Sequence, residues 1–358
     1  MAITIETPSG MDALTEFLLF HDEVYQPRSA RWTALVPFQL PVLTGESPFA
    51  CDRVLRPFVA REGGRVVARV LSAIDRRYQR HWHQRLGHVL MFEALPETRE
   101  AVRRLVQTAC EWLAAQGADA ARAGMGMLDF PFVIDEQQML PPAFVRQNPA
   151  YYQSLLKDAG FETERGFVDY RIAVSTELVA RWESALEAAQ RQGFEMVPLK
   201  EVPETRRVTE FTAVYNDAFK AHWGWTPFTA EEVTSMMEAL APLGMLETSL
   251  IAYRGGVPLG VLWVTPDTSF LAVLAPGRTL RAEERVNFLG IGVAAAARGR
   301  GLALGMAAHA YLELVRRGAT HLSYTMVLDD NWPSRRTAEK LGAHVCANYL
   351  AYRRDLRR

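Results

Sequence analysis

Two arginines and two glycines alternate at Arg298, Gly299, Arg300 and Gly301, between a short apolar run and a long apolar-striped segment. This pattern predicts a strand over 288–293 that leads into a helix. The first amides of a helix have no partner within it, and the helix dipole is positive at that end. Glycine lets the backbone approach a ligand closely, and arginine adds positive charge. We therefore expect an anion cradle suited to a pyrophosphate.

Two well-known phosphate motifs do not fit this stretch. No Gly-Lys-Ser/Thr follows the glycines, so it is not a Walker loop. The glycine spacing also differs from G-x-G-x-x-G, and no acidic residue ends a following strand at the ribose distance. A plain helix start with solvated arginines is the alternative.

A second motif follows in "DDNWPSRRTAEKLGAH", with Asn331 at a predicted strand end and a short helix closing at Gly342. Together with the first motif, this order resembles the GCN5-related N-acetyltransferase superfamily. The match to its acyl-CoA pyrophosphate loop is carried by Val293, Arg298, Gly301 and Ala303. "RGGVPLGVLWVTPD" and, in the first half, "NPAYYQSLLKDAGFE" extend the resemblance to a tandem-domain subgroup, over nearly the whole chain.

The resemblance implies acetyl-CoA, or another acyl-CoA, as acyl donor, bound by backbone amides of the loop and of the preceding strand. An amine then attacks the thioester directly, from the opposite side of the sheet. The residues that the resemblance assigns to CoA are Ile291, Gly292, Val293, Arg298, Gly299, Arg300, Gly301, Leu302, Ala303, Asn331 and Ser334.

The catalytic groups are less well specified. Many members place a tyrosine four residues before the glycine of the last motif, to protonate the leaving thiolate, but this chain has Ala338 there. Either another group acts or the thiolate leaves unassisted, since a thiol pKa near 8.5 makes it a fair leaving group. Glu284, or a water held by Asn287, is the candidate proton relay. The resemblance implies a groove for the arm of CoA between two parallel strands that part, and Tyr324 lies on the second of these strands, beside the groove. The alternatives are a solvated turn carboxylate and a core tyrosine.

An aromatic cluster precedes a predicted helix of the second half. If these side chains face the groove, they shape the acceptor pocket; the alternative is a place in the core. The cluster consists of His222, Trp223 and Trp225.

The elements that would position these residues alternate between strands and helices. Hairpins around Gly63-Gly64 and Gly255-Gly256 align the two halves, as do "LLKDAGFE" and "TAEKLGAH". We infer an internal duplication with a period of roughly 180 residues. The predicted fold class is α/β. The chain is expected to have two tandem domains like those of the GCN5-related N-acetyltransferases (GNAT), over 1–172 and 173–358, each a mixed central sheet flanked by helices.

The first half lacks the cradle. Its corresponding segment, "PETRE", has no glycine, and Glu97 and Glu100 bring the wrong charge for a phosphate. We expect this domain to be degenerate for CoA and to buttress the second. The long aromatic segment 126–149 is predicted to form one wall of the acceptor cleft, with buried packing between domains as the alternative.

Composition sets the remaining expectations. The chain has 358 residues, a net charge of −1, 49% hydrophobic and 23% charged residues, and three scattered cysteines. These values predict a cytoplasmic globular protein with reduced thiols, no metal site, and neither nucleic acid nor membrane as partner. No signal peptide or membrane-spanning helix is expected, and the chain is expected to be a monomer or homodimer.

The leading functional hypothesis is an N-acetyltransferase that acts on a small amine, amino acid or peptide. The competing hypothesis is a non-catalytic acyl-CoA sensor or scaffold with the same fold. The missing tyrosine favours the second, and the intact loop with Asn331 favours the first.

Overall fold

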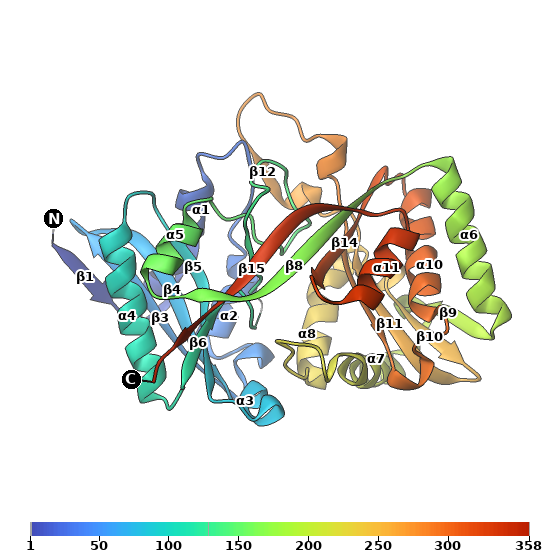
Figure 1. Ribbon diagram of the computed structural model, residues 1–358, viewed down its shortest axis with the longest axis horizontal. Helices are drawn as coiled ribbons and strands as arrows, with labels where there is room; N and C mark the ends of the chain where they lie inside the picture. Colours follow the sequence, from blue (N-terminus) through green and yellow to red (C-terminus); the bar gives the residue numbers. More distant parts are fainter. Residues whose placement is uncertain (1, 128, 358) are drawn as a thin grey trace.

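The computed structural model describes residues 2–127 and 129–357. Two halves lie side by side, and two long strands cross between them (Figure 1). The elements of the first half are β1 (Ile3–Glu6), α1 (Met11–Tyr25), β2 (Ala30–Trp32), α2 (Val36–Thr44), β3 (Arg53–Glu62), β4 (Arg65–Asp75), α3 (Arg76–Trp82), β5 (Leu86–Ala94), α4 (Arg99–Ala115), β6 (Ala120–Ala123), β7 (Phe132–Val133), α5 (Tyr152–Asp158) and β8 (Glu162–Ala173).

The second half repeats this order after a connecting helix. Its elements are α6 (Thr176–Arg191), β9 (Phe194–Pro198), α7 (Glu204–Phe219), α8 (Ala230–Leu240), α9 (Met245–Thr248), β10 (Leu250–Arg254), β11 (Val257–Thr265), β12 (Ala272–Leu274), β13 (Phe288–Val293), α10 (Leu302–Arg316), β14 (His321–Leu328), α11 (Trp332–Lys340) and β15 (His344–Asp355). The α/β class and both glycine-turn hairpins agree with the sequence prediction, because β3–β4 and β10–β11 are antiparallel pairs.

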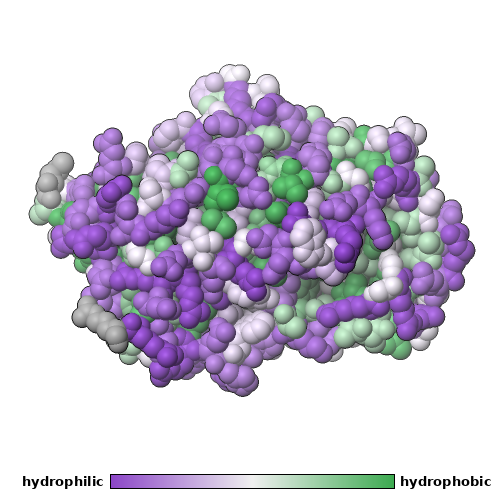
Figure 2. All heavy atoms as spheres, in the orientation of Figure 1, coloured by the Kyte–Doolittle hydropathy of each residue, from purple (hydrophilic) through white to green (hydrophobic). Residues whose placement is uncertain are grey.

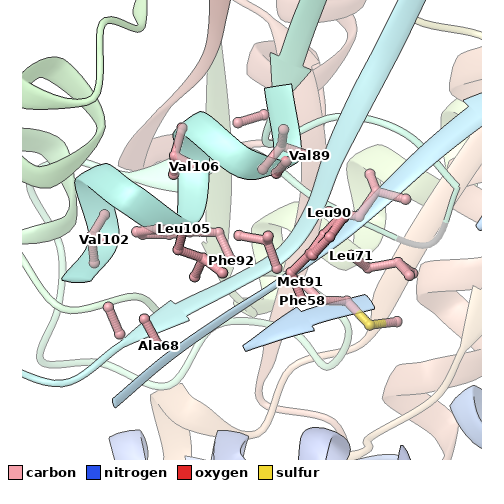
Figure 3. Packing of buried hydrophobic residues seen from close by; sticks show 14 of the residues in the cluster. Phe58, Ala68, Leu71, Val89, Leu90, Met91, Phe92, Val102, Leu105 and Val106 are labelled. Carbon is pink, nitrogen blue, oxygen red and sulfur yellow. The ribbon is translucent and has the colours of Figure 1, made fainter. Parts of the chain in front are cut away.

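The first half builds its core between the sheet and α4. The helix carries apolar residues at a spacing of three and four, so one face is apolar. Val102, Leu105 and Val106 point from α4 toward Phe92 of β5 (Figure 3). These four side chains are fully buried, and they belong to one continuous cluster that includes α1 and strands β3–β5.

The halves exchange their last strands. β15, from the second half, lies between β6 and β8 of the first half. β8, from the first half, in turn pairs with β14 of the second half. The large sheet therefore has the order β1-β3-β4-β5-β6-β15-β8-β14, while β13-β11-β10-β9 form a separate sheet. The sequence boundary near residue 172 is thus not a boundary in space.

A buried ion network also joins the halves. Glu232, in the first turn of α8, is fully buried and accepts hydrogen bonds from Arg53 at 2.6 Å and Arg77 at 2.8 Å. Arg53 also pairs with Asp75 at 2.9 Å. Glu232 further closes the predicted capping box with Thr229. One carboxylate thus fixes a helix start and holds two arginines of the other half.

The outer surface is mostly polar on the face shown in Figure 2, with scattered apolar spots. Within residues 2–127 and 129–357, no helix combines the length and apolar character needed to cross a bilayer. The same residues contain no group of three or more His, Cys, Asp or Glu side chains placed to hold a metal ion.

Replacing Glu232 with Ala should lower the free energy of unfolding by about 3–5 kcal/mol, because Arg77 loses its carboxylate partner and Arg53 keeps only Asp75. Urea unfolding followed by circular dichroism measures this change. The neighbouring, exposed Glu231 supplies the control, and its replacement by Ala should change stability little. Equal urea concentrations at the unfolding midpoint for the two variants would contradict a stabilising role for the ion network.

Candidate active site

The central feature of the second half is a pair of parallel strands that part. β13 ends one sheet and β14 ends the other, and no backbone ladder joins them among the described residues. Side chains hold them together at one end. The Ser323 amide donates to Asn287 Oδ1 at 2.9 Å, and the Thr325 hydroxyl donates to the Leu289 carbonyl at 2.7 Å. Beyond Leu289 no hydrogen bond joins the two strands among the described residues. We call this unbonded stretch beside the end of β13 the gap.

The far end of β13 presents one free edge to this gap. On its other side the strand pairs antiparallel with β11, where Ile291, Gly292 and Val293 lie opposite Leu262, Val261 and Gly260. In such a ladder, alternate amides point away from the partner strand. These amides can therefore bind an extended chain that enters the gap.

Gly292 also has a packing role. A Cβ at this position would lie 2.9 Å from Ala218 and from the ring of Phe219, both on α7. Only glycine allows α7 to approach this face of β13. The close contact places the C-terminal end of α7 against this face of the strand.

The predicted anion cradle follows β13. Gly299 and Gly301 have positive φ angles of 76° and 75°, and nothing lies within 4 Å of a Cβ at either position. Gly301 is the N-cap of α10, and no side chain caps this end. The first amides of α10 are therefore open to a ligand, and this arrangement fits a diphosphate group.

The two arginines of the loop differ in role. Arg298 is already engaged, because its Nη2 donates to the Ala218 carbonyl at 2.9 Å and its Nε to the Val293 carbonyl at 3.4 Å. It ties the loop to α7. Arg300 is exposed beside the two glycines, where its charge is available to an anion. Leu302 is buried and Ala303 is half-buried, so these two contribute through their amides.

Tyr324 of β14 and Ser334 of α11 come together. The Tyr324 hydroxyl lies 3.0 Å from the Ser334 hydroxyl, and Asn331 caps α11 by accepting from the Ser334 amide at 3.3 Å. Burial raises the pKa of Tyr324 to about 12. The phenol is therefore protonated at neutral pH and can donate. Ala338, at the position where many members of the resembled superfamily have a tyrosine, is fully buried in the core.

The carboxylate of Glu284 is surrounded by hydrogen-bond donors of the protein, which is typical of a structural residue and not of a proton relay. The fully buried carboxylate accepts from Arg278 at 2.7 and 2.9 Å, from the Arg281 amide at 3.1 Å and from the Leu140 amide at 3.2 Å. Burial alone raises its pKa, but these hydrogen bonds outweigh burial and lower it. An ionised carboxylate whose two oxygens already accept these hydrogen bonds is a poor base.

Asn287 is likewise structural. Its side-chain oxygen holds the Ser323 amide, and its carbonyl accepts from the Ser323 hydroxyl. It therefore sets the closed end of the gap. Its side-chain Nδ2 is buried without a partner in the described chain, so the role of Asn287 as the holder of a water stays a prediction.

The aromatic cluster of the second half divides between two environments. Trp223 faces the first half, where the guanidinium of Arg122 lies 4.1 Å from its ring centroid. Trp225 and His222 instead pack on Phe219, at centroid distances of 5.1 and 5.5 Å. Burial lowers the pKa of His222, so its ring is neutral at pH 7. Trp225 and His222 thus flank β13 through Phe219.

Sequence reasoning missed several residues that line this region. Ser323 and Thr325 bridge the strands, and their alternation within "HLSYTMVL" was the available signal, since residues two apart share a strand face. The sequence also did not predict Tyr215 in this region. Its hydroxyl lies 3.7 Å from the position that a Cβ would take at Gly290. Nothing local to α7 indicated that contact.

The first half contributes an aromatic wall from segment 126–149, of which Leu128 lies outside the described residues. The rings of Phe130 and Phe144 each lie 6.0 Å from Phe288, at the start of β13. Arg122 and Met125 reach the same region, since a Cβ at Gly224 would meet Met125 at 3.0 Å. Both halves therefore surround the face of β13 next to α7.

The corresponding gap of the first half is filled. β5 and β6 pair in parallel only up to Val89 and Ala123. Arg146 then inserts, donating to the Phe92 carbonyl at 3.0 Å and to the Phe130 carbonyl at 3.2 Å, and pairing with Asp129. The Phe92 carbonyl of β5 is therefore already bonded to a side chain of the same half.

Comparisons with known proteins agree with this geometry. Residues 210–343 match the family model described as "Acetyltransferase (GNAT) family". "Protein YghO" of Escherichia coli (strain K12) is 20% identical over 270 residues, which cover 74% of this chain and 68% of that protein. "Bacterial ceramide synthase" of Caulobacter vibrioides is 24% identical over 204 residues, 54% of this chain. The matched region spans about half of that relative, 51%.

Solved structures cover the whole chain. A "tandem GNAT protein from the clavulanic acid biosynthesis pathway" superposes with a TM-score of 0.60 at 12% identity, over 100% of this chain and 99% of that one. A fungal "GCN5-related glucosamine N-acetyltransferase region" gives 0.61 at 17% identity, over 98% of this chain but only 38% of that one. Residues 210–343 thus resemble the GNAT family, and the whole chain has the fold of a tandem GNAT protein.

Proposed function

We propose that this protein is an acyl-CoA-dependent N-acyltransferase with one active site, in its second half. The observation that carries the proposal is the gap between β13 and β14, which opens beside the uncapped, glycine-opened start of α10. A strand edge and a helix start together offer amides to the two parts of CoA that need them, the amide-containing arm and the diphosphate.

Different backbone amides of the site bind different parts of acyl-CoA. The amides of Gly299, Gly301 and the first turn of α10 hold the diphosphate, and Arg300 adds charge. The amides of β13 that face the gap bind the arm and the thioester carbonyl. Negative charge develops on that oxygen when the amine attacks, and fixed donors stabilise it there. The neutral amine nitrogen forms a bond to the carbonyl carbon and gives up one proton to water. The carbon–sulfur bond breaks, and the sulfur leaves as thiolate.

The Tyr324–Ser334 pair is the proposed proton source for that thiolate. A phenol kept protonated by burial, in contact with a second hydroxyl at the start of α11, can pass a proton to the leaving sulfur. This pair takes the place of the tyrosine absent at position 338. It also favours an enzyme over a sensor, because a protein that only binds acyl-CoA needs no proton donor at the gap.

We propose acetyl-CoA as donor and a small amine, amino acid or peptide as acceptor. The acceptor enters on the α7 side of β13, where Phe219, Trp225 and Phe288 present aromatic rings. These rings favour an acceptor with an apolar body. The names of two similar proteins, a ceramide synthase and a glucosamine N-acetyltransferase region, mark a long-chain amine and an amino sugar as the first alternatives to assay.

Replacing Gly301 with Asp should abolish CoA binding, because a carboxylate would stand where the diphosphate binds. Replacement with Asn is the matched control, since Asn has nearly the same size and tolerates positive φ. Isothermal titration calorimetry with CoA should give no measurable heat for the Asp variant and weakened binding for the Asn variant. Unchanged affinity in the Asp variant would place the cradle elsewhere. Glu100→Ala in the first half should leave CoA affinity unchanged.

Replacing Tyr324 with Phe should lower kcat by about 10²-fold, the size of a typical general-acid contribution, and leave the Kd for CoA within about twofold. Thiol release with acetyl-CoA and a panel of amines measures kcat. A variant that retains full turnover would remove Tyr324 from the reaction. The same panel tests the enzyme itself, because CoA binding without turnover of any amine would favour the sensor.

Replacing Glu284 with Gln should lower stability by about 1–3 kcal/mol at neutral pH and leave the pH profile of turnover unchanged. The folded-state pKa lies below the ordinary value of 4.5, so the ionised group stabilises the fold at neutral pH. That contribution is lost as the pH falls below about 4.5. Denaturation at pH 7 and at low pH should therefore show a difference between wild type and variant that shrinks in acid. A changed pH profile of turnover would return Glu284 to the reaction.

A further inference from the structure

Arg171 of β8 is a buried cation that forms no salt bridge with another described residue. The residue is only 5% exposed. Its Nη2 donates to the Leu140 carbonyl at 3.4 Å, whereas its Nε and Nη1 are buried and have no hydrogen-bond partner in the described chain. A guanidinium that has lost its water and has no partner charge is costly to the fold. This position therefore calls for a ligand that supplies negative charge or acceptor atoms.

A small cavity adjoins this guanidinium, at the place where β8 and β15 meet a loop of the first half. The volume of the cavity is about 10 Å³, which is the room that one water-sized particle needs. Its walls include Glu136 and Arg146 of that loop, Asp169 and Arg171 of β8, and Cys346 of β15. None of the residues assigned above to CoA lines the cavity, so it is separate from the proposed CoA site.

Two other charged groups of the lining are already engaged elsewhere. Arg146 pairs with Asp129. Glu136 is half-buried, and its Oε1 accepts from two amides of its own loop at 2.6 and 2.9 Å. Neither group therefore provides the partner that Arg171 lacks.

Asp169 is the remaining acid of the lining. It accepts from the Met326 amide at 3.3 Å, and burial raises its pKa to about 7. In mildly acidic solution this carboxyl is therefore mostly protonated and can donate a hydrogen bond. The titratable and charged groups that share the cavity with it are Arg171, Arg146, Glu136, Cys346 and Tyr349.

We propose that this cavity binds one small monovalent anion of the size of chloride, which pairs with Arg171. A guanidinium suits this role because it is weakly hydrated and its N–H groups form strong, charge-assisted hydrogen bonds. The size of the cavity excludes sulfate and larger anions. The bound ion joins β8 and β15 to the loop of the first half that covers them. This proposal does not depend on the proposed function.

The melting temperature in two salts tests the proposal. At about pH 6, replacing sodium gluconate with sodium chloride at an equal concentration of about 0.2 M should raise the melting temperature by about 2 °C, because the ion binds only the folded chain. Arg171→Met should abolish this chloride effect. Arg165→Met is the matched control, since Arg165 lies on the same strand with a side chain that is 39% exposed, and it should keep the chloride effect.

A wild type with the same melting temperature in both salts would overturn the proposal and leave a water molecule between Arg171 and Asp169 as the occupant. An equal chloride effect in wild type and Arg171→Met would also overturn it, because chloride would then act elsewhere. If Arg171→Met does not fold, a wild-type crystal soaked in sodium bromide at the same pH decides the question. An anomalous difference peak in the cavity supports the proposal, and an empty cavity overturns it.

Discussion

The missing ladder between β13 and β14 is the constraint on which the site depends. Parallel neighbours normally share a continuous set of backbone hydrogen bonds, but here Asn287, Ser323 and Thr325 replace it at one end with side-chain bonds. Past Leu289 the backbone groups facing the gap have no protein partner in the described chain. Such groups must be solvated or bound by a ligand. An extended molecule with its own amide groups satisfies them best.

The first half meets the same constraint in another way. Its parallel pair also separates, after Val89 and Ala123, but the carbonyl of Phe92 accepts from Arg146. A buried guanidinium then needs carboxylates, and Asp129 and Glu93 lie beside it. The two halves thus share a backbone plan and differ in what fills the gap. In the first half a side chain of the same half supplies the partner, whereas in the second half the described chain supplies none.

Local sequence signals predicted much of this structure because their physics is local. Gly63-Gly64 and Gly255-Gly256 form tight turns, and Gly299 and Gly301 adopt positive φ before α10. The role of Glu284 could not be predicted, since one of its partners, Leu140, is 144 residues away. The strand exchange was equally hidden. β8 and β15 end corresponding halves with similar patterns, so either strand could complete either sheet.

The strand exchange is a physical means by which the first half can support the second, as the sequence predicted. β14 forms one side of the gap, and its outer edge is held by β8, a strand of the first half. Asp169 of β8 accepts from the Met326 amide at 3.3 Å, where β14 bulges and Met326 has a φ of 51°. β8 is locked in turn by a long ladder with β15. The first half therefore holds the outer edge of the strand that borders the gap.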